Sequence, residues 1–214
     1  MTLKTSSRAR LNRTTRAAFP GETLFDALGR AVSDAECLPR KELYEAWAVA
    51  KRVRRRLRGG PILEVAAGHG LLSYMLLLLD KTSGPATCVD RRRPASAGRL
   101  EAALCAVWPR LAGQLEYREA RASEVEVPEG ALVISVHACG RLTDRVLDLA
   151  IGAGAPVAVL PCCQSTKSCD TGGLEGWLEG RLAVDVTRAL RLRSAGYRTH
   201  TVTIPTRSPP RTGS

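Results

Sequence analysis

The sequence of 214 residues has few aromatic side chains and no long uninterrupted apolar run. Phe, Trp and Tyr together make up 4% of it, so Leu, Val and Ala must fill most of a core. The longest apolar stretch, residues 71–79, is interrupted by Ser73 and Tyr74. It is far shorter than the ~20 residues that a membrane-spanning helix needs. The composition therefore predicts a folded globular chain without a transmembrane segment.

The seven cysteines include no Cys-x-x-Cys pair, which is the main signature of a zinc-binding loop. Their number is odd, and the neighbours Cys162 and Cys163 are too constrained for an ordinary structural disulfide. We therefore expect reduced thiols in the cytoplasm rather than a secreted disulfide framework. Five side chains could in principle converge on a metal ion: Cys139, Cys162, Cys163, Cys169 and His137. Without the paired spacing, we expect no metal site.

Acidic residues are scarce relative to basic ones, and the formal net charge is +11. Arginine clusters in residues 8–16, 51–58 and 91–93. Such clusters favour a polyanionic partner such as RNA, because neutralising phosphates releases counterions. The alternative is that these arginines are simply solvated. Since aromatic residues that could stack on bases are few, both interpretations stay open.

Residues 1–19 contain no acid and are rich in Arg, Ser and Thr. A transit peptide and a flexible basic arm would both fit this composition. Because no apolar secretory core follows, we expect the arm.

Residues 20–60 predict two helices that pack on the core. Apolar residues recur at helical spacing in residues 24–32 and again in residues 43–57. Leu38-Pro39 ends the first run and Gly59-Gly60 ends the second. Basic residues cover the remaining surface of the second helix, so we expect it to present a basic face.

From residue 61 to residue 205, short apolar runs alternate with amphipathic segments. Most runs lack period-two polarity, as is typical of strands buried on both faces of a parallel sheet. The predicted strands are residues 62–65, 86–89, 115–118, 132–136, 157–160 and 199–204, and the predicted helices are residues 71–79, 95–107, 143–151 and 174–194. We therefore expect one α/β domain with a Rossmann-like, doubly wound, mostly parallel sheet.

The chain stops shortly after the sixth predicted strand, and we expect residues 206–214 to form a disordered tail. One common kind of Rossmann-like sheet finishes with a hairpin of a sixth strand and a reversed seventh strand. That strand is either missing here or replaced by the N-terminal segment, and the sequence leaves both possibilities open.

The first predicted strand runs into a turn of small residues, Glu64-Val65-Ala66-Ala67-Gly68-His69-Gly70. In Rossmann-like sheets the ligand lies beyond the carboxyl ends of the strands, where this turn must approach it closely. Gly68 and Gly70 give the steric freedom for that approach, and Ala66 stands where the pattern has its first glycine. Glu64, at the strand end, can bind a cofactor directly or through water.

Asp90 ends the second predicted strand, 22 residues after Gly68, close to the ~20-residue offset at which an acid reaches ribose hydroxyls. Arg91 follows it, and Ser123 stands after the third strand, where an adenine could lie. This spacing also fits a dinucleotide cofactor. A dinucleotide fingerprint has a third glycine, however, where this chain has Ser73. The pattern therefore favours S-adenosylmethionine over NAD.

Two further groups follow the fourth and fifth predicted strands. One is the box His137-x-Cys139-Gly140-x-x-Thr143-Asp144, and the other is Cys162-Cys163. Because the carboxyl ends of parallel strands meet at one edge of a sheet, we expect both groups to face the cleft that holds the cofactor.

Together these features resemble a known family, the methyltransferase-like domain shared by eukaryotic tRNA acceptor-stem 2′-O-methyltransferases and glutathione S-transferase C-terminal-domain-containing proteins. The resemblance extends over most of residues 40–205. It rests on five places: Glu64 to Gly70, Asp90-Arg91-Arg92, the His137 box, Cys162-Cys163, and Asp185-x-x-Arg188 with Gly196-Tyr197. It implies a class I methyltransferase with S-adenosylmethionine as its cofactor. The implied cofactor-binding residues are Glu64, Ala66, Gly68, Gly70, Asp90, Arg91, Ser123 and His137.

The resemblance also implies an RNA acceptor, with tRNA as the family's example. The chain departs from the tRNA enzymes at Val136, where they have a lysine, and at Gln164 and Ser165, where they have histidines. A protein or small-molecule methyltransferase, or an inactive cofactor-binding module that interacts with RNA, therefore stays an alternative.

The candidate catalytic residues are His137, Cys139, Asp144 and Cys162. His137 could serve as a general base, or could be a buried histidine bonded to a loop carbonyl. Asp144 could orient His137 or cap the following helix. Cys162 follows Pro161, and this Pro-Cys pair is similar to the nucleophile motif of cytosine-5 methyltransferases. The alternative is that Cys162 and Cys163 are packed or line the substrate site.

Overall fold

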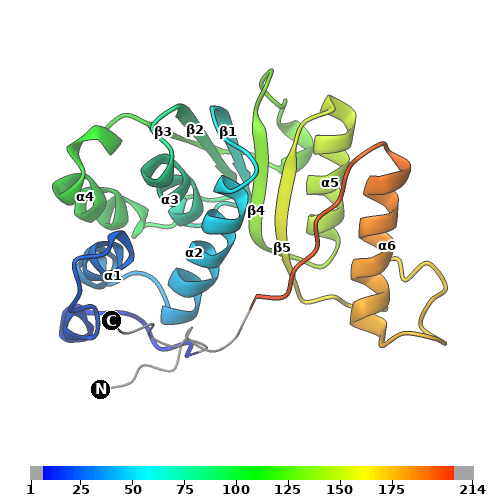
Figure 1. Ribbon diagram of the computed structural model, residues 1–214, viewed down its shortest axis with the longest axis horizontal. Helices are drawn as coiled ribbons and strands as arrows, with labels where there is room; N and C mark the ends of the chain where they lie inside the picture. The colour runs from blue at the N-terminus through cyan, green and yellow to red at the C-terminus, as the bar shows by residue number, and fades with distance from the viewer. Residues whose placement is uncertain (1–6, 205–214) are drawn as a thin grey trace.

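A computed structural model describes residues 7–204 and contains a five-stranded parallel sheet of order β3-β2-β1-β4-β5 (Figure 1). The strands are β1 (Gly60–Val65), β2 (Ser83–Asp90), β3 (Leu115–Glu119), β4 (Leu132–Cys139) and β5 (Val157–Cys162). The order reverses between β1 and β4, and such a switch point opens a crevice at the carboxyl ends of the strands. The predicted Rossmann-like α/β fold is confirmed.

Helices cover both faces of this sheet. They are α1 (Leu24–Ala35), α2 (Arg40–Arg54), α3 (Leu71–Leu79), α4 (Ala97–Val107), α5 (Arg141–Ala153) and α6 (Gly180–Ser194), with short 3-10 helices η1 (Arg13–Ala18), η2 (Pro109–Leu111) and η3 (Ala122–Glu124). Within residues 7–204, no helix combines the length and the apolar character that crossing a membrane requires.

The two faces of the sheet belong to two apolar clusters, because successive side chains of a strand point in opposite directions. Ile62 of β1 packs with α1, α2, α3 and α4, whereas its neighbour Leu63 packs with α5. Helix α3 is buried over almost its whole length, from Leu71 to Leu78. The longest apolar run of the sequence is therefore a core helix.

The described part of the predicted basic arm, residues 7–19, packs against the N-terminal helices. Leu11 and Phe19 are buried in the core. The backbone N–H of Leu11 donates to the carbonyl of Leu38, and Arg10 forms an isolated bridge with Pro39. These residues therefore form a layer of the fold rather than an arm, because their apolar side chains have core positions to fill.

The C-terminal part differs from the prediction. Residues 199–204 form no strand, and Ile204 instead packs against the core at the margin of the first apolar cluster. Helix α6 begins at Gly180, later than the predicted residue 174. The sheet therefore has five strands within residues 7–204, and the N-terminal segment adds none. The predicted tail, residues 206–214, lies outside the described residues.

The amino edge of the sheet is held by a buried ion pair. Arg54, at the end of α2, has its Nη1 3.6 Å from Oδ2 of Asp80, and both side chains are almost fully buried. Arg54 Nε also donates to the carbonyl of Leu76. Burial opposes the ionisation of Asp80, but hydrogen bonds from the Gly59 N–H and from Thr82 keep its pKa well below the usual range. One arginine of the predicted basic face is thus part of the core.

We expect Asp80→Asn to lower the free energy of unfolding by about 3 kcal/mol, because it leaves the Arg54 guanidinium buried without its counter-charge. Urea denaturation at pH 7 measures the change. The matched control is Glu116→Gln, which breaks a fully exposed pair with Arg118 and should leave the stability unchanged. Equal stability of the two variants would contradict the structural role of Asp80.

Candidate active site

The turn between β1 and α3 has left-handed backbone at three alternating positions. The φ angles are 56° at Ala66, 52° at Gly68 and 73° at Gly70. Gly70 has no room for a side chain, since a Cβ there would lie 3.0 Å from Cys88 Sγ. At Gly68 a Cβ would meet open space. Ala66 takes up a conformation that glycine adopts freely, at a cost of about 1–2 kcal/mol.

Side chains from β2 and β3 hold the middle of this turn. The N–H of Gly68 donates to Asp90 Oδ2 at 3.0 Å, and the hydroxyl of Tyr117 donates to the Gly68 carbonyl at 3.0 Å. The other carboxylate oxygen of Asp90 accepts from the N–H of Arg91. Asp90 therefore lies at the turn and positions the backbone there, while its binding of a ribose stays a prediction.

Glu64 is buried under the turn and bound by α3. Its Oε2 accepts from the N–H of Ser73 at 2.9 Å and from the Ser73 hydroxyl at 2.6 Å. Burial raises the pKa of Glu64 to about 7, although the hydrogen bonds from Ser73 oppose the shift. Ser73, which stands where a dinucleotide fingerprint has its third glycine, thus anchors the Glu64 carboxylate.

A cavity of about 410 Å³ opens beside the turn, within the usual size range of small-molecule sites. Its carboxylates are Glu64 from β1 and Glu42 from α2, and burial raises the pKa of Glu42. No lysine or arginine is among the described residues that line it. The lining residues are Cys37, Leu38, Pro39, Glu42, Ala46, Glu64, Ala66, Ala67, Gly68, His69, Leu71, Leu72, Pro94, Val136 and His137.

The N-terminal helices supply one wall of this cavity, which the sequence analysis missed. The sequence predicted only that residues 20–60 pack on the core. In the structure, however, Cys37, Leu38 and Pro39 line the cavity together with Glu42 and Ala46. One signal was present. Glu42 stands one helical turn before Ala46, on the apolar side of the helix, where a solvated acid is not expected.

His137 lies at the cavity on a strained piece of backbone. Its φ is 66°, and the register between β4 and β5 shifts between Val136 and Cys139. The ring Nε2 lies 3.0 Å from Glu45 Oε2 of α2, within ion-pair distance. Both atoms are buried and neither is aligned for a hydrogen bond. The two side chains therefore face each other at ion-pair distance without a hydrogen bond.

Comparison with known proteins identifies the domain. A family model described as a methyltransferase domain matches residues 41–169, more than half of the chain. The chain belongs to this methyltransferase domain family. S-adenosylmethionine is therefore the cofactor of the domain. No curated protein sequence matches the chain.

Among solved structures, the chain is similar to an O-methyltransferase family protein from Burkholderia thailandensis, with 17% identity and a TM-score of 0.48 over 92% of this chain. It spans 62% of the length of that protein. It is also similar to the mitomycin 7-O-methyltransferase MmcR, at 17% identity, a TM-score of 0.46, and coverage of 85% of this chain and 54% of that one. The 23S rRNA methyltransferase ErmE gives 20% identity, a TM-score of 0.38, and coverages of 54% and 45%.

The cavity fits the cofactor of the methyltransferase domain. S-adenosylmethionine carries a sulfonium, an ammonium and a carboxylate group and no phosphate, and the cavity offers Glu42 and Glu64 to the two cations. The bare backbone of Gly68 leaves room against the turn.

Four of the predicted cofactor contacts lie outside the cavity lining: Gly70, Asp90, Arg91 and Ser123. Arg91 is exposed immediately after β2, and Ser123 is exposed on η3, just beyond the end of β3. Their assignment as cofactor ligands therefore stays a prediction.

Asp144 does not contact His137. Its carboxylate binds Arg188 of α6 in a bidentate pair, with Nε to Oδ1 at 2.7 Å and Nη2 to Oδ2 at 3.0 Å. Arg188 Nη2 also donates to the Gly140 carbonyl, so the pair ties α6 to the turn before α5. Neither predicted role of Asp144, orienting His137 or capping the helix, is seen in these contacts.

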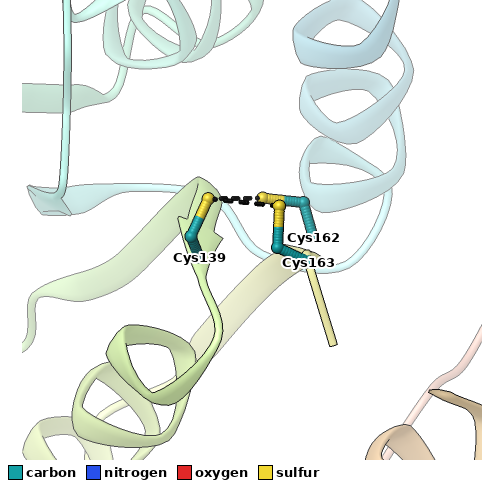
Figure 2. A group of neighbouring side chains, drawn as sticks. All are labelled: Cys139, Cys162 and Cys163. Carbon is teal, nitrogen blue, oxygen red and sulfur yellow. Dashed lines mark hydrogen bonds between the residues drawn. The ribbon is translucent and has the colours of Figure 1, made fainter. Parts of the chain in front are cut away.

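The thiols of Cys139, Cys162 and Cys163 lie together (Figure 2). Cys169 lies elsewhere, against Arg188. Burial raises the pKa of Cys162, and the neighbouring sulfur of Cys139 raises it further. A nucleophilic cysteine needs the opposite shift, because the thiolate is the reactive form. The site therefore does not favour covalent catalysis by Cys162.

The raised pKa of Glu64 predicts a pH-dependent stability. The native state favours the protonated carboxyl, so this stabilisation is complete below about pH 4.5 and is lost as pH rises through about 7. For Glu64→Gln we expect that loss, about 3 kcal/mol, to be absent. Urea denaturation of both proteins from pH 5 to pH 8 measures the difference. Parallel profiles would show that Glu64 does not titrate in this range.

Proposed function

We propose that the protein transfers a methyl group from S-adenosylmethionine to an RNA, and that tRNA is the first RNA to test. The observation that carries this proposal is a contrast of charge. The cavity lining contains two acids, Glu42 and Glu64, and no lysine or arginine, while arginines stand beside it in a chain of net charge +11. The acids of the cavity suit the cationic groups of the cofactor, and the arginines beside it suit a polyanionic acceptor.

Two sets of arginines support an acceptor at this edge of the sheet. Arg10 and Arg99 lie near the cavity residue His69, whose pKa is lowered by burial and further by these two guanidinium groups. Arg91 and Arg92 follow β2 directly at its carboxyl end and are exposed. We name the four residues Arg10, Arg91, Arg92 and Arg99 the arginine rim.

The second basic cluster, residues 51–58, lies away from the cavity. Glu42 lines the cavity near the start of α2, and Arg54 lies 12 residues later, about 18 Å along the helix. That end of α2 leads into the amino end of β1, at the opposite edge of the sheet. From the sequence, the helix at 51–58 and the N-terminal residues 1–19 were the surface expected to face RNA. The surface we propose is the arginine rim, which keeps Arg10 of the N-terminal residues and leaves out the helix at 51–58.

Methyl transfer needs an acceptor held in line with the methyl group, so orientation supplies much of the rate. S-adenosylmethionine supplies the electrophilic methyl group. His137 is the side chain that we propose contacts the acceptor, because it lines the cavity and its Nε2 has no hydrogen-bond partner. Glu45, 3.0 Å away, would position the ring.

The cytoplasm is the compartment that we propose for this reaction. All seven cysteines are free, including three whose sulfurs lie close together. Such an arrangement suits a reducing compartment, because thioredoxin and glutathione keep neighbouring thiols from forming disulfides there.

The proposal predicts that label from radioactive S-adenosylmethionine enters total RNA and does not enter total protein. Asp90→Ala should abolish the incorporation, because it releases the Gly68 N–H that shapes the cofactor turn. Scintillation counting of the two pools after incubation measures the outcome. Label in the protein pool alone, or in neither pool, would contradict an RNA acceptor.

The arginine rim makes a second prediction. The double substitution Arg91→Ala and Arg92→Ala should reduce the slope of log affinity against log salt by about 2 for tRNA, because two phosphate contacts are lost. Fluorescence anisotropy at several salt concentrations measures this slope.

The matched control for the rim is the double substitution Arg55→Ala and Arg56→Ala, which removes the same charge from two exposed arginines at the other edge of the sheet. We expect it to leave the slope unchanged. If the two double variants behave alike, the tRNA contacts are not concentrated at the rim.

A further inference from the structure

Three thiols converge where β4 and β5 end, as Figure 2 shows. Cys139 Sγ lies 3.1 Å from Cys162 Sγ and 3.6 Å from Cys163 Sγ, and all three sulfurs lie within 4.8 Å of one another. Cys139 and Cys163 are exposed and Cys162 is half-buried. The methyltransferase assignment gives these sulfurs no role, and we call them the thiol cluster.

The convergence depends on unusual backbone at both strand ends. In an extended chain Cys162 and Cys163 would point to opposite faces of the sheet, because side chains alternate. Cys163 instead has a φ of 54°, in the left-handed region, and both sulfurs face Cys139. On the other strand, His137 has a φ of 66° where the register with β5 shifts, just before Cys139.

Such strain carries information about function. A non-glycine residue in the left-handed region costs on the order of 1–3 kcal/mol and persists only where the surroundings impose it. Here two such residues, His137 and Cys163, lie beside one cluster of sulfurs. They come from the ends of β4 and β5, which are distant in the sequence. Packing alone does not require this arrangement, since two of the three thiols are exposed.

We propose that the thiol cluster binds one zinc ion through Cys139, Cys162 and Cys163. Soft thiolate sulfurs are preferred ligands of zinc. Zn–S bonds of about 2.3 Å in tetrahedral geometry place the sulfurs about 3.8 Å apart, so shifts below about 1 Å complete the site. Binding replaces the three thiol protons, which pass to solvent, and no oxidant or reductant is needed.

A fourth coordination position stays open on the exposed side of the cluster. Structural zinc sites are closed by four protein ligands, whereas a site with three protein ligands keeps a place for water or a further ligand. A disulfide is a weaker interpretation, because it would join two of the sulfurs and leave the third without a reason to be there.

Equilibrium dialysis of the reduced, untagged protein against buffered Zn²⁺ tests the proposal. We expect one zinc per chain, and at least a 100-fold weaker affinity for Cys139→Ser and for Cys163→Ser. Both positions are exposed, so the fold should tolerate these substitutions. Cys105→Ser, at a half-buried cysteine of α4, is the matched control and should bind zinc like the wild type.

Two further measurements use the same variants. Co²⁺ in place of zinc should give thiolate-to-metal charge-transfer absorption in the wild type and in Cys105→Ser, and weaker absorption in Cys163→Ser. Zinc at about 100 times its Kd should raise the Tm of the wild type by roughly 5–10 °C and leave that of Cys163→Ser unchanged.

Three results would overturn the proposal. They are no zinc bound at micromolar free concentration, equal binding by wild type and Cys139→Ser, and a Cys139 to Cys162 disulfide in protein that binds no zinc when reduced. None of these measurements involves methyl transfer, so a failure here would leave the proposed function untouched.

Discussion

The carboxylate of Asp90 holds the arrangement on which the site depends. Its hydrogen bond from the Gly68 N–H ties the end of β2 to the turn that follows β1. Glu64 ties the same turn to α3 through Ser73. Of the three left-handed residues in this turn, Gly68 and Gly70 adopt that conformation freely, and only the strain at Ala66 has to be offset by contacts of the surrounding structure. Without them the wall of the cavity would lose its shape.

Helix α2 serves both ends of the sheet, which explains its mixed sequence. Its first turns carry Glu42 and Glu45 to the cavity and to His137, while its last turn buries Arg54 against Asp80. The ion pair at the amino edge therefore sets the positions of Glu42, about 18 Å away, and of Glu45, about 14 Å away, because a helix transmits position along its length. The residue that stabilises the amino edge and the residues that reach the site therefore lie on the same helix.

The sequence predicted what local pattern and spacing determine. Apolar runs located the five strands, and the interval between Gly68 and Asp90 placed an acid at the turn. Contacts between distant segments were beyond its reach: Glu45 beside His137 and Arg188 on Asp144. The meeting of Cys139, Cys162 and Cys163 was within it, because they follow the fourth and fifth predicted strands and the carboxyl ends of parallel strands meet at one edge. Left-handed backbone at His137 and Cys163 was hidden as well, because only glycine announces such a conformation in a sequence. Residues 199–204 had a strand pattern but no neighbouring strand to pair with.

If the acceptor is the RNA that we propose, the distribution of charge also limits which part of it can react. Glu42 and Glu64 line the cavity, and a phosphate group brought there would meet carboxylates and no lysine or arginine among the described lining residues. Phosphates are instead attracted to the arginine rim outside it. A ribose hydroxyl or a base edge carries no charge and can pass where a phosphate cannot. The proposed acceptor atom is therefore an oxygen or nitrogen of the nucleoside, presented while the backbone stays at the rim.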